Sequence, residues 1–245
     1  DDFSHVARDH WDMGADFIMA PALSGTVSVN SDGSGDYATF ADLFTALTTD
    51  GIEGNVNVEV AAGSYGPATL SGAIPGADET SQVHIYSVGG DVIVDGGWDA
   101  YALGFTGTSW VHLEGLDLVM DAFNEFSNGA LYIGGSTNMD ISHCRIHQSG
   151  FVGMLVSESQ NIRIWNNFIY DTAAANISLA MCGADANIEI WNNSLYYNNP
   201  NFGGFFGPPA QCLALTESSA NVHNNIFFKD VLDQGDGGPW DSSKG

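Results

Sequence analysis

The chain has 245 residues, 44% of them hydrophobic, and it carries 30 Asp and Glu against five Lys and Arg, a formal net charge of −25. The apolar share suits a folded core and excludes general disorder. The scarcity of cations argues against nucleic acid as a partner, and the sequence lacks the ~20-residue apolar stretch that crosses a bilayer. We therefore expect a folded protein that neither binds nucleic acid nor inserts into a membrane.

The first 24 residues form a predicted N-terminal arm. Apolar side chains such as Trp11, Phe17 and Met19 need a partner, so we expect residues 1–24 to pack along the body of the protein or on a second subunit. The chain starts at Asp1 and not at Met, and we expect that an export signal has been removed. The expected location is therefore secreted, extracellular or on the cell surface.

Residues 25–55 are predicted to form a strand and a short capping helix. Thr39 is of the residue type that caps helix N-termini. Four apolar side chains then fall on one helical face: Phe40, Leu43, Phe44 and Leu47. Such a helix protects the end of a stack of strands from solvent.

Residues 56–229 contain a repeated pattern in which apolar and polar residues alternate, which is typical of strands. The inner apolar positions of successive copies are 23 to 32 residues apart, a period that indicates a solenoid. These positions are Ile85, Leu113, Ile141, Ile164, Ile190 and Val222. Two more short strands complete each copy. The pattern predicts an all-β fold, a right-handed parallel β-helix of six or seven three-sided coils spaced roughly 4.8 Å apart.

Asparagine recurs at one turn of this repeat, at Asn166, Asn192 and Asn224. Asparagine tolerates the left-handed backbone of a sharp turn, and stacked side-chain amides can hydrogen-bond from coil to coil. We therefore interpret these three residues as a structural ladder and not as a binding site.

Two early segments carry characteristic turns: residues 27–47 contain Asp-Gly-Ser-Gly-Asp, and residues 56–65 end in Gly-Ser-Tyr. These segments resemble the start of pectin-lyase-like right-handed β-helix proteins, and most of all that of pectin methylesterases. The resemblance spans roughly residues 25–228 and implies the β-helix fold with a role connected to polysaccharides. The catalytic motifs of pectin methylesterases and polygalacturonases are absent, so an enzyme of this shape would be a polysaccharide lyase or glycoside hydrolase of another pattern.

Two columns of outward side chains run from coil to coil along the first strands. They read His84, His112, Asp140, Arg163, Glu189, Asn221 and Tyr86, Glu114, Ser142, Trp165, Trp191, His223. Flat rings beside charged groups suit a sugar, whose CH face stacks while its hydroxyls form hydrogen bonds. Trp165, Trp191, Glu189 and Arg163 are therefore candidate substrate-binding residues. The alternative is that the aromatic stack only stabilises parallel strands.

Three long loops are expected to overhang the third strand of the coils, where proteins of the resembled superfamily hold their cleft. Their ranges are 120–129, 170–176 and 196–211. Asp121 and Asp171 are the candidate catalytic carboxylates for acid–base hydrolysis, with His147 assisting. Tyr132 and Tyr197 are candidate substrate-binding residues on the same side. The alternative is that these loop carboxylates are merely solvated.

No metal-binding residues are predicted. The sequence has no HExxH motif, and His143 and His147 fall on different strands, so zinc is not expected. Calcium is the cofactor that two acidic groups could hold if each folds together. These groups are Asp91, Asp95, Asp99 and Asp230, Asp233, Asp236.

The three cysteines have no metal-binding spacing. Cys182 and Cys212 are expected near the same strand of successive coils, within disulfide reach if the registers agree. Cys144 lies beside the asparagine turn, where we expect it to be buried.

Two hypotheses remain for function. The first is a secreted β-helix protein that binds or processes a polysaccharide through its aromatic and acidic stripe and its long loops. The second is a non-enzymatic structural or adhesive extracellular subunit. Residues 230–245 form an acidic tail without a recognisable cap, so such a subunit would self-associate through its open last coil and its N-terminal arm.

Overall fold

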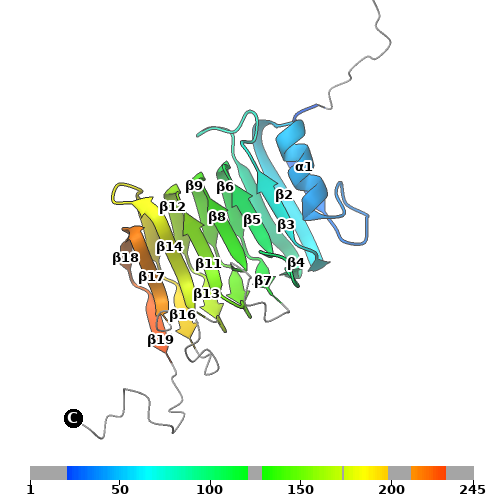
Figure 1. The fold of residues 1–245 in the computed structure, drawn as a ribbon. Helices are drawn as coiled ribbons and strands as arrows, with labels where there is room; N and C mark the ends of the chain where they lie inside the picture. Colours follow the sequence, from blue (N-terminus) through cyan, green and yellow to red (C-terminus); the bar gives the residue numbers. More distant parts are fainter. Residues whose placement is uncertain (1–20, 121–128, 173, 198–210, 230–245) are drawn as a thin grey trace, which may run out of the picture.

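The computed structural model describes residues 21–120, 129–172, 174–197 and 211–229, and the predictions on residues outside these ranges, including the arm and the tail, are not addressed by it. Within these ranges the chain forms nineteen strands and one helix. All strand pairs between these elements are parallel, and the strands wind into a β-helix (Figure 1). The predicted fold class is therefore confirmed.

The first turn of the β-helix is closed by α1 (Phe40–Thr49), which follows β1 (Leu23–Val29). The Thr39 hydroxyl accepts a hydrogen bond from the backbone N–H of Asp42 and caps the helix, as predicted. The helix buries the four apolar side chains of its predicted face, and Phe44 packs on Phe105 in the core. No helix among the described residues is long and apolar enough to cross a bilayer.

The first strands of the coils form one stack of seven rungs on top of β1. They are β2 (Ile52–Tyr65), β4 (Val83–Asp95), β6 (Ser109–Glu114), β9 (Thr137–Ser142), β12 (Gln160–Trp165), β15 (Ile188–Trp191) and β18 (Asn221–His223). Each inner apolar position predicted from the repeat pairs with the next, from Ile85 opposite Leu113 to Ile190 opposite Val222. The register inferred from the repeats is thus confirmed along the whole stack.

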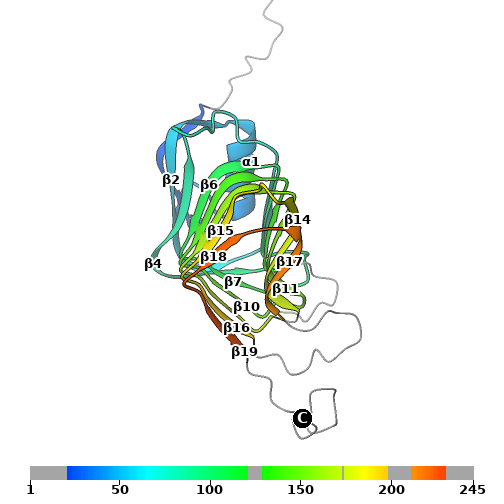
Figure 2. The ribbon, with the colours of Figure 1, turned by 90° about the vertical axis from the view of Figure 1, so that its left-hand side faces the viewer.

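Two further stacks complete the three-sided cross-section that Figure 2 shows along the coil axis. The long strands β2 and β4 bend into the second stack, which continues with β7 (Asp117–Val119), β10 (Arg145–His147), β13 (Phe168–Tyr170), β16 (Ser194–Tyr197) and β19 (Ile226–Lys229). The third stack contains β3 (Ala68–Ser71), β5 (Leu103–Thr106), β8 (Leu131–Gly134), β11 (Val152–Ser157), β14 (Ala175–Gly183) and β17 (Gln211–Ser218). The core fills the space between the three stacks.

The asparagine turn is confirmed in its backbone and corrected in its side chains. Asn166, Asn192 and Asn224 have φ angles of 57°, 56° and 53°, the left-handed conformation that the repeat predicted. The amide ladder, however, lies one residue later in each coil. It consists of Asn167, Asn193 and Asn225, whose side chains bond from coil to coil at 3.0 Å. The left-handed residue turns the chain, so the next side chain points inward, and Asn166 instead contacts His143.

The predicted disulfide is wrong because the register does not bring its cysteines together. β14 pairs with β17 so that Ala175 faces Gln211 and Ile177 faces Leu213, which sets Cys212 level with Asn176. Cys182 lies six residues further along β14, and its sulfur contacts the carbonyl oxygens of Val156 and Ala180. Cys144 is buried as predicted, and burial raises the pKa of its thiol to about 12.

The two ends of the stack differ. α1 covers the first coils, whereas the last described strands expose large apolar side chains. Ile226 is 65% exposed and Phe228 is 54% exposed, and Leu215, Val222 and Phe227 are exposed beside them. The expected acidic tail that follows lies outside the described residues.

Candidate functional site

A shallow groove of about 390 Å³ lies on the outer face of the first-strand stack. Its walls come from five successive strands, β4, β6, β9, β12 and β15, and from the residues just before them. The lining side chains are Gln82, Trp110, Val111, Asn138, Asp140, Asn161, Arg163, Asn187 and Glu189. The groove therefore follows the coil axis and is mostly polar, with one tryptophan.

One row of the groove consists of residues in the left-handed conformation. Asn138, Asn161 and Asn187 have φ angles of 53° to 54°, and the amide of Asn187 donates to the Asn161 side chain at 3.0 Å. In the coil before them Trp110 occupies this position with φ 64°. A bulky residue in this conformation is an outlier that costs about 1–2 kcal/mol. Backbone strain of this kind is found mostly at functional sites, where the surrounding structure holds the residue in place.

Trp110 was missed by the sequence reasoning, although the repeat contained its signal. The copy 110–115 aligns with those that begin at Asn138, Asn161 and Asn187, so a tryptophan replaces the repeated asparagine. Among the described residues no aromatic ring is stacked on Trp110, and its ring is half-buried at the groove wall.

Three residues of the predicted column, Asp140, Arg163 and Glu189, line the groove. Arg163 lies between Asp140 and Glu189 on neighbouring strands, in the register expected. The Arg163 guanidinium donates to both oxygens of Asp140, with 2.6 Å between Nε and Oδ1. Arg163 is half-exposed and Glu189 also lines the groove, so both predicted substrate-binding residues are placed at one surface.

Trp165 and Trp191 are adjacent as predicted, but they face each other and not the solvent. Their ring centroids are 5.0 Å apart with an interplanar angle of 7°. His223 stacks on the far side of Trp191, and His112 and the Arg163 guanidinium pack near Trp165. Because rings at equal positions stack along the coil axis, only their edges point outward. The flat apolar platform that was expected for a sugar is therefore not available at these two residues.

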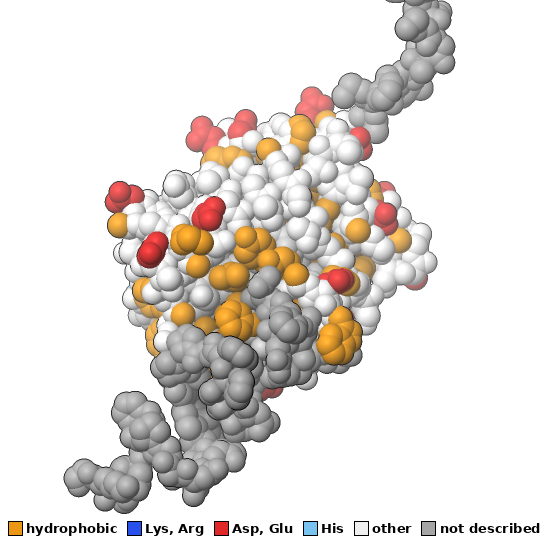
Figure 3. Space-filling model, viewed as in Figure 1, with side chains coloured by type: hydrophobic (Ala, Val, Ile, Leu, Met, Phe, Trp, Pro, Cys, Tyr) orange, Lys and Arg blue, Asp and Glu red, His pale blue; other side chains and the backbone are white. Residues whose placement is uncertain are grey.

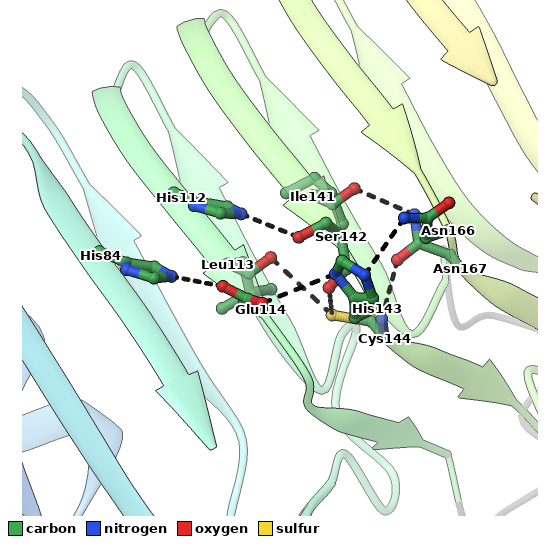
Figure 4. Close-up of polar contacts among 10 residues, drawn as sticks. All are labelled: His84, His112, Leu113, Glu114, Ile141, Ser142, His143, Cys144, Asn166 and Asn167. Carbon is green, nitrogen blue, oxygen red and sulfur yellow. Dashed lines mark hydrogen bonds and ion pairs between the residues drawn. The ribbon is translucent and has the colours of Figure 1, made fainter. Parts of the chain in front are cut away.

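Next to the groove, three potential metal ligands approach one another, which the sequence analysis did not expect. The donor atoms of His84, His112 and Glu114 all lie within 4.8 Å of one another (Figure 4). His84 Nε2 is 2.8 Å from Glu114 Oε2, and His112 Nε2 is 2.8 Å from Ser142 Oγ. Burial lowers the pKa of His112, and the neighbouring His84 lowers it further.

Of the three residues predicted to be catalytic, the structure describes Asp171 and His147. Asp121 lies outside the described residues, and Asp171 is half-exposed at the end of β13. His147 is held by Asp117, with Nε2 2.9 Å from Oδ1, and its ring stacks on Tyr170. Burial would raise the pKa of Asp117, but the hydrogen bond and charge of His147 and the charge of Arg145 outweigh burial and lower it. His147 and Asp117 therefore form a hydrogen-bonded pair on the neighbouring strands β10 and β7.

The two predicted tyrosines on the loop side have different environments. Tyr132 on β8 stacks on Tyr101, and its hydroxyl is 3.1 Å from Ser157 Oγ. Tyr197 is 3% exposed, and burial raises its pKa, so its side chain lies in the interior and not at the surface where the prediction placed it. Tyr197 is buried because the alternation along β16 points it and Leu195 toward the interior.

Figure 3 shows acidic and apolar side chains across the coloured part of the face in this view, with no lysine or arginine visible.

The predicted calcium ligands do not gather in the described part of the chain. Asp91 lies 3.3 Å from the Arg145 guanidinium, and the Asp95 carboxylate accepts a hydrogen bond from the Gly97 N–H. Within the described ranges Asp91, Asp95 and Asp99 form no common cluster of donor atoms. The second acidic group, in the tail, lies outside the described residues.

A family model described as a right-handed β-helix region matches residues 81–240, well over half of the chain. The chain belongs to the right-handed β-helix family. No curated protein matches this β-helix protein. Two crystal structures of the pectin methylesterase from Aspergillus niger, one deglycosylated and one penultimately deglycosylated, are similar to it at 13% identity and a TM-score of 0.43. Each alignment covers 87% of this chain and 93% of the fungal chain.

Proposed function

We propose that this β-helix protein binds a polysaccharide or oligosaccharide in the groove between Trp110 and Glu189. The observation that carries the proposal is the lining of the groove: an unstacked tryptophan at one end and a row of polar side chains continuing over the next three coils. Rungs roughly 4.8 Å apart repeat at about the length of one sugar ring, so successive sugars can meet equivalent groups. A chain molecule is thus a better match for this groove than a small ligand.

Each lining group suits a sugar. The amides of Asn138, Asn161 and Asn187 offer both donors and acceptors, which is what sugar hydroxyls require. The Trp110 ring can stack on the CH face of a sugar, because no other described ring occupies its face. Convergent polar groups beside an aromatic surface are typical of ligand sites that fix orientation by hydrogen bonds.

The charge of the groove favours a neutral glycan or one with amino sugars. Two carboxylates and one guanidinium line it, so it carries one net negative charge, and the whole protein carries −25. A chain of uronates would be repelled by this field. We therefore infer that pectin-like substrates are disfavoured, whatever the resemblance of the early segments implies.

Binding without bond cleavage is the activity that the contacts support best. Asp140 engages both carboxylate oxygens with Arg163, so it is poorly placed to transfer a proton to a glycosidic oxygen. A glycan partner also accords with a location outside the cell, which we include in the proposal.

A glycan panel tests the proposal. Immobilised cello-, xylo- and chito-oligosaccharides represent neutral and amino-sugar chains, and polygalacturonate and alginate represent uronates. We expect binding to the first group, reduced about tenfold by Glu189→Gln, since a hydrogen bond to a charged group contributes about 1.5–3 kcal/mol. Glu53→Gln, an exposed glutamate outside the groove, is the matched control and should bind normally. Binding to none of the five glycans, or equal effects of the two variants, would reject the groove as the site.

The exposed apolar side chains of the last described strand support a second candidate function, self-association. Ile226, Phe227 and Phe228 expose apolar surface on the last described strand, where another chain could pair. Sedimentation analysis should then show oligomers that dissociate in an Ile226→Ser, Phe228→Ser variant. A monomer at all concentrations would remove this candidate.

A further inference from the structure

His84 and His112 form an unusually close pair on the outer face of the first-strand stack. They occupy paired positions on the neighbouring strands β4 and β6, and their rings stack at 4.4 Å with an interplanar angle of 4°. Both side chains therefore leave the sheet in the same direction, and the rigid backbone of two paired strands holds them there.

A carboxylate completes the group. Glu114 follows His112 by two residues, so it projects from the same face of β6. Its Oε2 reaches diagonally to His84 Nε2 at 2.8 Å, and the three donor atoms lie within 4.8 Å of one another. Two nitrogen ligands of one tetrahedral zinc ion lie roughly 3.4 Å apart for zinc–nitrogen bonds of about 2.05 Å. The present separations of up to 4.8 Å exceed this by about 1.4 Å, so metal binding requires the side chains to rotate toward a common point.

Surrounding groups steady the cluster, as Figure 4 shows. Ser142 lies at hydrogen-bond distance from His112, and His143 Nδ1 lies 3.6 Å from Glu114 Oε1. The Asn166 amide in turn contacts His143 Nε2 at 3.1 Å. Outer contacts of this kind orient metal-binding side chains.

The donor set indicates which ion fits. Two imidazoles and one carboxylate suit zinc and neighbouring divalent transition metals, whereas calcium takes six to eight oxygen ligands. Three protein ligands leave a fourth position for water or another ligand. We propose that His84, His112 and Glu114 form a binding site for one divalent transition-metal ion of the zinc type. The site is separate from the groove residues and does not depend on the proposed glycan.

The test is metal titration of the full chain without a histidine tag, after removal of metals with a chelator. Calorimetry with Zn²⁺ alone, and the visible absorption of Co²⁺ as a second probe, give stoichiometry, affinity and coordination. We expect one equivalent to bind, with nitrogen ligands in the Co²⁺ spectrum. His84→Gln, His112→Gln and Glu114→Gln should each weaken binding at least about tenfold.

Two control variants keep the result specific. His223→Gln changes a histidine of the same face that lies outside the cluster, and it should leave the affinity unchanged. His5→Gln with His10→Gln removes the two histidines of the arm, which lies outside the described residues. The proposal is overturned if no stoichiometric binding occurs, or if binding survives all three cluster variants. It is equally overturned if the arm variant, and not the cluster variants, abolishes binding. Circular dichroism of each variant verifies that the β-helix is retained.

Discussion

Two columns of asparagine lie along the first-strand stack, one in the turns that follow the strands and one at or just before the strand starts. The first is a structural ladder, and the second borders the groove for which we propose glycan binding. The inner column, Asn167, Asn193 and Asn225, begins beside the core, with Asn193 only 1% exposed. The outer column, Asn138, Asn161 and Asn187, borders the groove and is open to solvent at its last two members. Both recur once per coil, so repetition alone does not distinguish a structural residue from a binding residue.

The two columns differ in the hydrogen bonds that their side chains form and in whether asparagine is present in every coil. Each inner amide bonds to a neighbouring coil and to a backbone carbonyl, as Asn193 does with Asn225 and Ile164. In the outer column, one coil-to-coil bond between side-chain amides is found among the described residues, and it joins Asn187 and Asn161. In the coil before them Trp110 replaces asparagine at a strained φ. An uninterrupted buried column indicates stability, and a strained exception at the surface indicates function.

The largest effect is expected in the inner column. Asn193→Ala should lower the free energy of unfolding by about 2–4 kcal/mol, because the Asn167 backbone N–H and the Ile164 carbonyl each lose a partner in a buried place. Urea denaturation followed by circular dichroism measures this change.

The matched change in the outer column is Asn187→Gly, which keeps the left-handed backbone without strain. We expect a loss within about 0.5 kcal/mol, as for an ordinary surface change. Equal losses in the two variants would contradict the distinction between the columns.

A smaller effect is expected at the aromatic stack. Trp165→Ala should lower the free energy of unfolding by about 1–2 kcal/mol, since the ring loses contacts with Trp191 and His112. Glycan binding in the groove should change less than twofold, because the faces of this ring are already covered. A large loss of binding with unchanged stability would show instead that Trp165 contacts the glycan.

The Asp117–His147 pair tests whether a polar contact outside any ladder also stabilises the fold. The folded-state pKa of Asp117 is lowered, so its contribution is present above the unfolded pKa of about 3.9 and is lost as the pH falls through the folded value. Asp117→Asn should therefore flatten the loss of stability below about pH 4, measured as urea midpoints at stepped pH.

The sequence sufficed for the fold because alternation and a repeat of 23 to 32 residues determine which side chains become vertical neighbours. The columns from His84 to Asn221 and from Tyr86 to His223 were predicted in full and are confirmed by the strand register. The capping helix was predicted from the same kind of periodicity.

The cluster of His84, His112 and Glu114 was less predictable, because its contacts join the two predicted columns of outward side chains. His84 reaches Glu114 diagonally, from one column to the other, and columns considered one at a time conceal such a pair. The loop-side prediction stays untested at Asp121, which lies outside the described residues, whereas strand alternation buries Tyr197. The disulfide failed because the sequence could not give the offset between β14 and β17.

The most direct test of the groove is the variant Trp110→Asn, which restores the residue of the neighbouring coils. If Trp110 is kept in a strained conformation for the glycan, the variant should raise the free energy of unfolding by about 1 kcal/mol and weaken the tightest glycan of the panel at least about tenfold. Titration calorimetry and urea denaturation of the same preparation measure both quantities. A variant that binds the glycan as well as the wild type would contradict the account.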